Sequence, residues 1–259
     1  MRFDDLDKRM RLYEESTDRK VPPDVRIVAR LDGRGFSQLT AEGSCFEKPF
    51  DYSFKWLMGN TTKDLMNCGF NVEIGYHQSD EISLLFKRDE DTFNRKTRKY
   101  ISTLAGVASA SFSLAHGKPV SFDCRISELP TDQHVFDYFA WRTEDAHRNC
   151  LNSHCYWLLR NQGHSAKSAA NQLLKASKGQ KHELLFKNNI VFEKLPDWQR
   201  HGCFYGFQEY EKAGWNPVLQ REEVARRRMI ARLGKDGDAR TELEILRIQL
   251  KEPHNAPTP

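Results

Sequence analysis

The chain of 259 residues lacks several patterns that define large protein classes. It contains no Gly-x-x-x-x-Gly-Lys-[Ser/Thr] loop, which excludes a P-loop nucleotide site. No apolar stretch approaches the roughly 20 residues that a membrane-spanning helix needs. We find no signal peptide, and the chain has six cysteines, so we expect free thiols in a reducing cytoplasm.

Cysteine pairs typical of zinc sites are also missing, because no Cys-x-x-Cys occurs. The nearest approach is the group His147, Cys150, His154 and Cys155, in which Cys150 and His154 would share one face of a helix. This spacing is not that of a standard zinc site. We therefore interpret the group as helix packing and keep a bound zinc ion as the alternative.

A strong net charge is lacking as well, since the formal charge is +4 and the pI about 8.7. This mild basicity is compatible with RNA binding without requiring it. The basic residues are clustered, however. Arg95, Lys96, Arg98 and Lys99 open a predicted helix, and Arg226–Arg228 form a second cluster. Each cluster is a candidate for tracking the phosphate backbone of an RNA, with a solvated helix face as the alternative.

Two carboxylate motifs are the strongest positive signal in the sequence. They are Arg30–Phe36 (RLDGRGF) and His77–Glu81 (HQSDE). Each Asp follows an apolar run that predicts a strand. The predicted strands lie at 25–31, 70–76 and 82–86, with a helix at 52–68 between the first two.

This order of elements brings the two motifs together. A strand–helix–strand crossover makes the first two strands parallel. Asp32 then lies just past the first strand, and Asp80 lies in the turn between the second and the third. If the third strand pairs beside the first, as in a split βαβ arrangement, the carboxylates meet at one sheet edge. The predicted fold class is α+β.

Mg²⁺ prefers oxygen ligands in near-octahedral geometry. Asp32 and Asp80 with the backbone carbonyl of Gly33 would suit it, and Gly35 would let nearby N–H groups approach phosphate oxygens. Glu81 is adjacent to Asp80, but alternation along a strand turns it away, so we assign it a supporting catalytic role, with a metal-ligand role as the alternative. The alternative is that each motif is a simple turn, and their joint occurrence favours the metal site.

Further motifs follow in the order FEKP, FDCR, YFAWR and ELLF, at Phe46–Pro49, Phe122–Arg125, Tyr138–Arg142 and Glu183–Phe186. Together with RLDGRGF and QSDE they resemble the tRNA-His guanylyltransferase family over roughly residues 20–190. The resemblance implies a palm-like catalytic domain of ferredoxin or RRM-like βαββαβ type. It also implies two Mg²⁺ ions, ATP and GTP or other nucleoside triphosphates as substrates, tRNA as the partner and a homotetramer.

The implied activity is addition of nucleotides to the 5′ end of tRNA, in the 3′-to-5′ direction. ATP would activate a 5′-monophosphate and release pyrophosphate. The 3′-hydroxyl of the incoming nucleotide would then displace AMP. Both steps are centred on phosphate, so we expect the protein to act by positioning and by charge neutralisation.

The family pattern also assigns roles to individual residues. It implies nucleotide contacts at Arg30, Gly33, Arg34, Gly35, Phe36, Lys48, Ser79 and Arg125. Lys48 suits a phosphate as a compact point charge, whereas a surface ion pair is the alternative for Arg30 and Arg125. His147 and Asn149 are the candidates for activating or placing the 5′ end.

One stretch departs from the family pattern. Members that add G₋₁ to tRNA-His in eukaryotes carry His-Ile-Asn-x-Leu-Tyr-Asn, where this chain has His147–Ser153 (HRNCLNS). Only His147, Asn149 and Leu151 are kept. The departure resembles the bacterial and archaeal Thg1-like branch. That branch implies templated repair of 5′-truncated tRNAs, alongside G₋₁ addition or instead of it.

We divide the chain into a palm-like core at 1–135, helices and strands that complete the catalytic domain at 136–212, and a C-terminal arm at 213–259. Helices are predicted at 131–163 and 165–177, and strands at 120–126, 183–192 and 201–210. The arm is predicted to be helical at 222–233 and 240–251 with a disordered end. We expect it to serve tRNA binding or oligomerisation.

Two other classes stay open on the sequence. A palm-type nucleotidyl cyclase would use the same metal chemistry without RNA, although the Gly-Gly-Asp-Glu-Phe motif of diguanylate cyclases is absent. A non-catalytic RRM-like RNA-binding module would need stacking aromatics on its central strands. The first predicted strand instead offers Arg26, Arg30 and Asp32.

Overall fold

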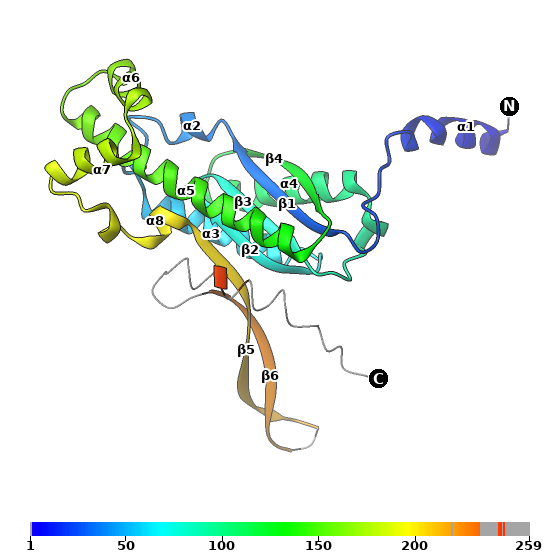
Figure 1. The fold of residues 1–259 in the computed structure, drawn as a ribbon. Helices are drawn as coiled ribbons and strands as arrows, with labels where there is room; N and C mark the ends of the chain where they lie inside the picture. The colour runs from blue at the N-terminus through cyan, green and yellow to red at the C-terminus, as the bar shows by residue number, and fades with distance from the viewer. Residues whose placement is uncertain (1, 219, 234–242, 245, 247–259) are drawn as a thin grey trace.

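The structure is a computed structural model that describes residues 2–218, 220–233, 243–244 and 246. Within them, eight α-helices accompany one six-stranded sheet (Figure 1). The strand order is β4-β1-β3-β2-β5-β6, and all neighbours are antiparallel. The strands are β1 (Arg26–Arg34), β2 (Val72–Gln78), β3 (Glu81–Phe86), β4 (Ser121–Leu129), β5 (Cys203–Asn216) and β6 (Arg221–Arg232).

The helices include the long crossovers predicted from the sequence and several short elements. They are α1 (Phe3–Glu15), α2 (Phe36–Leu39), α3 (Tyr52–Met66), α4 (Thr97–His116), α5 (Asp132–Asn161), α6 (Ala166–Lys175), α7 (Lys178–Lys187) and α8 (Asp197–His201), with 3₁₀ turns η1 (Thr92–Arg95) and η2 (Phe192–Lys194). None of the described helices combines the length and the apolar character that crossing a bilayer requires.

Both faces of the sheet are covered by helices, with α3 and α4 on one face and α5 on the other (Figure 1). Alternation along β1 divides its side chains between the two layers. Ile27 and Leu31 pack in the cluster that α3 and α4 share, whereas Val28 packs with Phe139 of α5. A third cluster joins the second half of α5 to α6 and α7.

The central pairing agrees with the predicted split βαβ arrangement. β3 lies between β1 and β2 and is antiparallel to both, so β1 and β2 are parallel to each other. The end of β1 and the turn after β2 therefore lie at the same edge of the sheet. One detail differs, because Asp32 lies within β1 and not past it.

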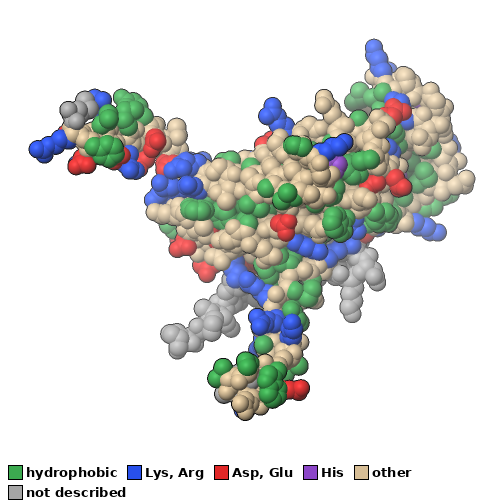
Figure 2. Space-filling model, turned by 180° about the vertical axis from the view of Figure 1, so that it is seen from behind, with side chains coloured by type: hydrophobic (Ala, Val, Ile, Leu, Met, Phe, Trp, Pro, Cys, Tyr) green, Lys and Arg blue, Asp and Glu red, His purple; other side chains and the backbone are tan. Residues whose placement is uncertain are grey.

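The predicted helix at 222–233 is wrong, since β5 and β6 form a long hairpin that projects from the body (Figures 1 and 2). Twelve residue pairs run from Tyr205 opposite Arg232 to Asn216 opposite Arg221. Residues 222–233 are rich in helix formers, but pairing along β5 overrides that local preference. The predicted helix at 240–251 lies mostly outside the described residues.

The predicted strand at 183–192 is also wrong, because α7 occupies most of this stretch. The Ser177 hydroxyl accepts the backbone N–H of Gln180, whose side chain accepts the N–H of Ser177. This reciprocal capping box starts the helix at Lys178. The predicted helices at 131–163 and 165–177 are confirmed as α5 and α6.

Candidate active site

A backbone hydrogen bond joins the two carboxylate motifs. The N–H of Gly33 in β1 donates to the carbonyl oxygen of Asp80, in the turn between β2 and β3, over 3.1 Å. Ser79 in this turn has φ 47°, a left-handed conformation that tightens the connection. The structure thus brings Asp32 and Asp80 to the same place, as the sequence predicts.

Register places a third carboxylate on the same side of the sheet. Glu81 of β3 lies directly opposite Asp32 of β1, and opposed residues in an antiparallel pair point to one face. Glu81 was expected to turn away from the site. It instead lines the same cavity as Asp32 and Asp80.

This cavity, which we call the acidic cavity, has a volume of about 340 Å³. Its walls come from the β1 edge, the β2–β3 turn, α5 and α8. The lining carboxylates are Asp32, Asp80, Glu81 and Asp145. Such a concentration of negative charge is suited to a cation or to a ligand that carries one.

Burial in the acidic cavity disfavours the ionised forms of Asp80 and Glu81. Burial raises the pKa of Asp80, and the charge of Asp32 raises it further. Burial also raises the pKa of Glu81, while Arg142 and Arg30 oppose that rise. Within the described part of the chain, Asp32 and Asp80 form no ion pair with Lys or Arg.

Arg142 on α5 holds Glu81 in place. Its Nη1 atom lies 3.2 and 3.1 Å from the two carboxylate oxygens of Glu81, and its Nη2 atom lies 2.9 Å from Asp145. The guanidinium also stacks 3.8 Å from the ring centroid of Trp141. Arg142 belongs to the YFAWR motif, but no role was assigned to it from the sequence.

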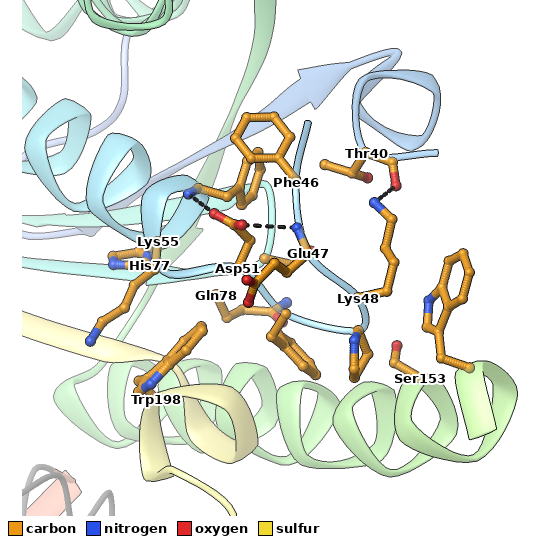
Figure 3. A pocket seen from close by; sticks show the side chains of 15 residues that line it. Thr40, Phe46, Glu47, Lys48, Asp51, Lys55, His77, Gln78, Ser153 and Trp198 are labelled. Carbon is orange, nitrogen blue, oxygen red and sulfur yellow. Dashed lines mark hydrogen bonds between the residues drawn. The ribbon is translucent and has the colours of Figure 1, made fainter. Parts of the chain in front are cut away.

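A second cavity, which we call the Lys48 cavity, adjoins the first and has a volume of about 210 Å³ (Figure 3). The two share the lining residues Phe50, Gln78, Ser79, Ser153 and Trp198. Aromatic rings make up much of the wall, together with the charged side chains of Glu47, Lys48, Asp51 and Lys55. An aromatic wall with few charged groups suits a nucleobase next to phosphate.

Lys48 is held at the wall by its neighbours (Figure 3). Its ammonium donates to the carbonyl oxygen of Thr40 and, over 3.1 Å, to the hydroxyl of Ser44. Burial lowers the pKa of Lys48, while the nearby carboxylate of Asp51 opposes this. Asp51 in turn caps α3, since its carboxylate accepts the N–H of Phe54 at 2.8 Å.

His77, which begins the HQSDE motif but was assigned no role of its own, forms part of the same wall. It is buried, stacks on Tyr205 at 5.7 Å and lies 3.3 Å from the Tyr205 hydroxyl through Nε2. Burial lowers its pKa to about 3, so the ring is neutral near pH 7. Trp198 was also missed, because α8 reaches the site only through the tertiary fold.

The other residues predicted to contact nucleotide are placed as follows. Phe36 is buried in an aromatic cluster with Phe54, Phe112 and Phe122, so its side chain belongs to the core. Arg30 forms an ion pair with Glu81, with 3.6 Å between its Nη1 atom and Oε2 of the carboxylate. Arg125 lies exposed on β4, 3.7 Å from Asp123, and Gly35 has φ 76°.

His147 and Asn149 are not brought together. Residues two apart on a helix point to different sides, and Asn149 lines the acidic cavity and donates to Asp145 over 3.2 Å. His147 instead packs against Phe192 and His201, at 5.0 and 5.2 Å between ring centroids. Burial lowers its pKa.

The alternative zinc site is not formed in the described residues, where no group of three or more His, Cys, Asp or Glu is placed to hold a metal ion. His154 pairs with Gln199 at 3.0 Å. The thiol of Cys155 donates to the carbonyl oxygen of Lys181 at 3.4 Å. The interpretation as helix packing is therefore the better one.

The basic cluster at 95–99 lies near the start of β1, whereas Asp32 is near its end. Arg95 donates to the carbonyl oxygens of Val21, Val25 and Glu90. Lys96 and Arg98 both bind Asp18, and Lys99 lies 5.5 Å from the ring centroid of Phe93. These contacts tie the chain before β1 to α4, and the tRNA role of the cluster stays a prediction.

Comparison with known proteins places the chain in a family. The profile described as tRNAHis guanylyltransferase matches residues 7–130, and that of the Thg1 C terminal domain matches residues 133–245. The chain is 33% identical to the tRNA(His) guanylyltransferase of Debaryomyces hansenii over 64% of this chain and 66% of that protein. It is 33% identical to that of Neurospora crassa over 73% of this chain and 68% of that protein.

Solved structures agree with this assignment. A bacterial tRNA(HIS) guanylyltransferase (Thg1)-like protein in complex with ATP has a TM-score of 0.68 and 29% identity, over 78% of this chain and 88% of that one. A complex of such a protein with GTP has a TM-score of 0.64 and 27% identity, over 86% and 90%. Because the two family profiles together cover most of its length, the chain belongs to the tRNA(His) guanylyltransferase family of nucleotidyltransferases.

Proposed function

We propose that this protein adds nucleotides to the 5′ end of tRNA in the 3′-to-5′ direction. The observation that carries the proposal is the convergence of Asp32 and Asp80 on one cavity, in a chain of this family. Membership of a nucleotidyltransferase family argues against the non-catalytic RNA-binding alternative.

The acidic cavity fits Mg²⁺. Asp32 and Asp80 offer carboxylate oxygens to a cation. Burial raises the pKa of Asp80 and the charge of Asp32 raises it further, and a bound cation would relieve that repulsion. We propose that Asp32, Asp80 and the Gly33 carbonyl hold Mg²⁺ at this site. The proposed two-metal mechanism requires two such ions. When bound, Mg²⁺ would neutralise phosphate charge and make the attacking hydroxyl more acidic.

The Lys48 cavity is the proposed nucleotide site. The complexes of related bacterial proteins with ATP and with GTP support a triphosphate substrate. Lys48 and Ser79 would contact its phosphates, and the aromatic wall would take the base. The pKa of Lys48, lowered by burial, would rise again when a phosphate anion came close.

The proposed reaction has two steps. A 5′-phosphate oxygen of the tRNA attacks the α-phosphorus of ATP, so that pyrophosphate leaves and a 5′-adenylylated end forms. The 3′-hydroxyl of GTP, or of another nucleotide, then attacks that 5′-phosphorus and AMP leaves. The strand order β4-β1-β3-β2, with α3 and α4 on one face, supports a palm-like arrangement for this chemistry.

A 5′-end extension assay tests the proposal, with Mg²⁺, ATP and all four nucleoside triphosphates. It compares full-length tRNA-His with a non-His tRNA that lacks its first nucleotide. The HRNCLNS stretch departs from the eukaryotic pattern at Arg148, Asn152 and Ser153, which leads us to expect templated restoration of the truncated tRNA. G addition only to tRNA-His would contradict the repair activity.

A nucleotidyl cyclase is the second candidate, and the same assay distinguishes it. Incubation with the triphosphates alone would give a cyclic product if the second candidate is correct. Extension of neither tRNA, with a cyclic product formed, would overturn the tRNA proposal.

A further inference from the structure

One face of α3 carries aromatic and lysine side chains in alternation. Tyr52, Lys55, Trp56 and Lys63 fall within a narrow arc of the helix, since 3.6 residues make one turn. Tyr52 is 62% and Trp56 60% exposed. We call these four residues the α3 stripe.

The α3 stripe begins beside the Lys48 cavity. Lys55 lines that cavity with Trp198 (Figure 3). Its ammonium lies 4.9 Å from the Trp198 ring centroid and 5.7 Å from that of Tyr52. The rings of Tyr52 and Trp198 are themselves 5.1 Å apart. An exposed aromatic group and a cation are thus held together next to the proposed nucleotide site.

The stripe ends at the sheet. Lys63 lies 5.7 Å from the ring centroid of Tyr205, near the start of β5. From Tyr52 to Lys63 the helix rises about 16 Å at 1.5 Å per residue, which is long enough for more than one nucleotide. Within the described residues neither lysine forms an ion pair with a carboxylate, so both charges are available to a ligand.

Folding does not account for this surface. Leu57, Met58 and Leu65 lie away from the stripe on α3 and pack in the core, so they already anchor the helix. Tyr52 and Trp56 keep most of their area in water, and single exposed aromatics are ordinary. Two of them interleaved with lysines along one face match the pattern of single-strand nucleic-acid binding, in which bases stack on rings and cations follow the phosphates.

We propose that the α3 stripe binds an unpaired segment of the RNA substrate. Bases stack on Tyr52 and Trp56, while Lys55 and Lys63 pair with the phosphates between them. The inference rests on the proposed function and deepens it, because it names the surface along which an unpaired strand lies next to the nucleotide site. The positive charge of the stripe fits a polyanion.

The test compares two double variants, both apolar at these positions, of which only one keeps the aromatic rings. Y52L/W56L keeps apolar side chains but removes the rings, whereas Y52F/W56F keeps the rings. F186L, at an aromatic residue 69% exposed on α7, is the matched control. Fluorescence anisotropy measures binding of a short labelled single-stranded RNA and of a blunt duplex of the same sequence. GTP binding and the melting temperature report that the fold and the nucleotide cavity are intact.

We expect Y52L/W56L to bind the single strand about 10-fold or more weakly, because stacking on each base is lost. Y52F/W56F should retain most of the affinity, F186L should match wild type, and the duplex should be affected much less. Wild-type affinity in Y52L/W56L, or an equal loss for single strand and duplex, would overturn the proposal.

The extension assay, run in parallel, separates this proposal from the proposed function. A wild-type protein that extends tRNA while Y52L/W56L binds RNA normally would disprove only the stripe. A wild-type protein that neither binds RNA nor extends tRNA would disprove the function as well.

Discussion

The N–H of Gly33 and the carbonyl oxygen of Asp80 are joined by a hydrogen bond of 3.1 Å. This bond links the end of β1 to the β2–β3 turn. Its donor, Gly33, is the residue after Asp32, and its acceptor is the backbone carbonyl of Asp80 itself. The spacing of the two carboxylates therefore depends on backbone geometry as well as on the side chains. Substitutions that disturb the bond should affect activity even where both carboxylates remain.

Asp32→Asn and Asp80→Asn should each lower nucleotide addition at least about 100-fold, the scale on which removal of one electrostatic group reduces catalysis. The amide keeps the shape but loses the charge that a metal needs. The affinity for tRNA should change little. Extension assays and tRNA binding measure the two effects. Asp137→Asn, on the exposed face of α5, is the control, and near-normal activity in both site variants would contradict the metal assignment.

Stability and activity should respond to pH in opposite directions at Asp80. Its pKa is raised from 3.8 in the folded protein, so the folded state holds the proton more tightly than the unfolded chain. Folding free energy is therefore lost as the pH rises through the range between the two pKa values. Activity that needs the ionised carboxylate increases through the same range.

Asp80→Asn removes this cost, so the variant should become more stable than wild type as the pH rises above 3.8. Urea unfolding at a series of pH values, with EDTA present, measures the difference in unfolding free energy. If the difference in unfolding free energy between the variant and wild type is the same at every pH, burial of the Asp80 charge does not destabilise the folded protein.

Gly33→Ala should destabilise the protein by about 1–3 kcal/mol, the usual cost of overpacking. A Cβ at this position would lie 2.4 Å from the Phe36 ring, which is itself packed in the core. The clash should also displace the Gly33–Asp80 bond and lower activity. Gly106→Ala is the control, because its Cβ meets no atom within 4 Å and helix propensity favours Ala. Equal unfolding midpoints for the two variants would contradict the steric argument.

Local patterns were sufficient to predict the central strands of the sheet. Alternation at 25–31 and 70–76 identified β1 and β2, and the intervening helix fixed their parallel relation. Because Asp32 lies near the end of β1 and Asp80 follows β2, their meeting follows from this parallel relation once β3 pairs beside β1. The orientation of Glu81 did not follow, because it depends on the register of β3 against β1.

Long-range contacts decided the features that the sequence did not predict. Residues 222–233 favour a helix locally, and only the paired length of β5 makes them a strand. Trp198 and His77 reach the Lys48 cavity from segments far apart in the chain, and no local pattern marks their meeting. The capping box at Ser177 and Gln180 was readable in the sequence as Ser-x-x-Gln and would have corrected the strand at 183–192.

Lys48→Met should raise the apparent KM for the nucleotide about 10-fold or more, since a hydrogen bond to a charged group contributes about 1.5–3 kcal/mol. Methionine retains the length of the side chain but not the charge. The affinity for tRNA should stay close to wild type. Steady-state kinetics with varied GTP measure the change, and Lys118→Met, in an exposed turn, is the control. An unchanged KM would remove Lys48 from the nucleotide site.

Arg142→Met should destabilise the protein by about 3–5 kcal/mol, because it leaves the buried charge of Glu81 without its main partner. Arg142 is 4% exposed and contacts both Glu81 oxygens as well as Asp145. Arg148→Met is a matched control on the same helix, since Arg148 approaches Asp145 at 3.7 Å but is 68% exposed. That surface pair should contribute less than about 1 kcal/mol. Urea unfolding measures both variants.

The double variant Glu81→Gln with Arg142→Met distinguishes loss of the pair from loss of packing. Removing both charges avoids the unpaired carboxylate, so the double variant should be more stable than Arg142→Met alone. It should nevertheless lose nucleotide addition if Glu81 supports the metal site. Equal stability of the double and single variants would mean that Arg142 acts through its contact with Trp141, at 3.8 Å, and not through its pairing with Glu81.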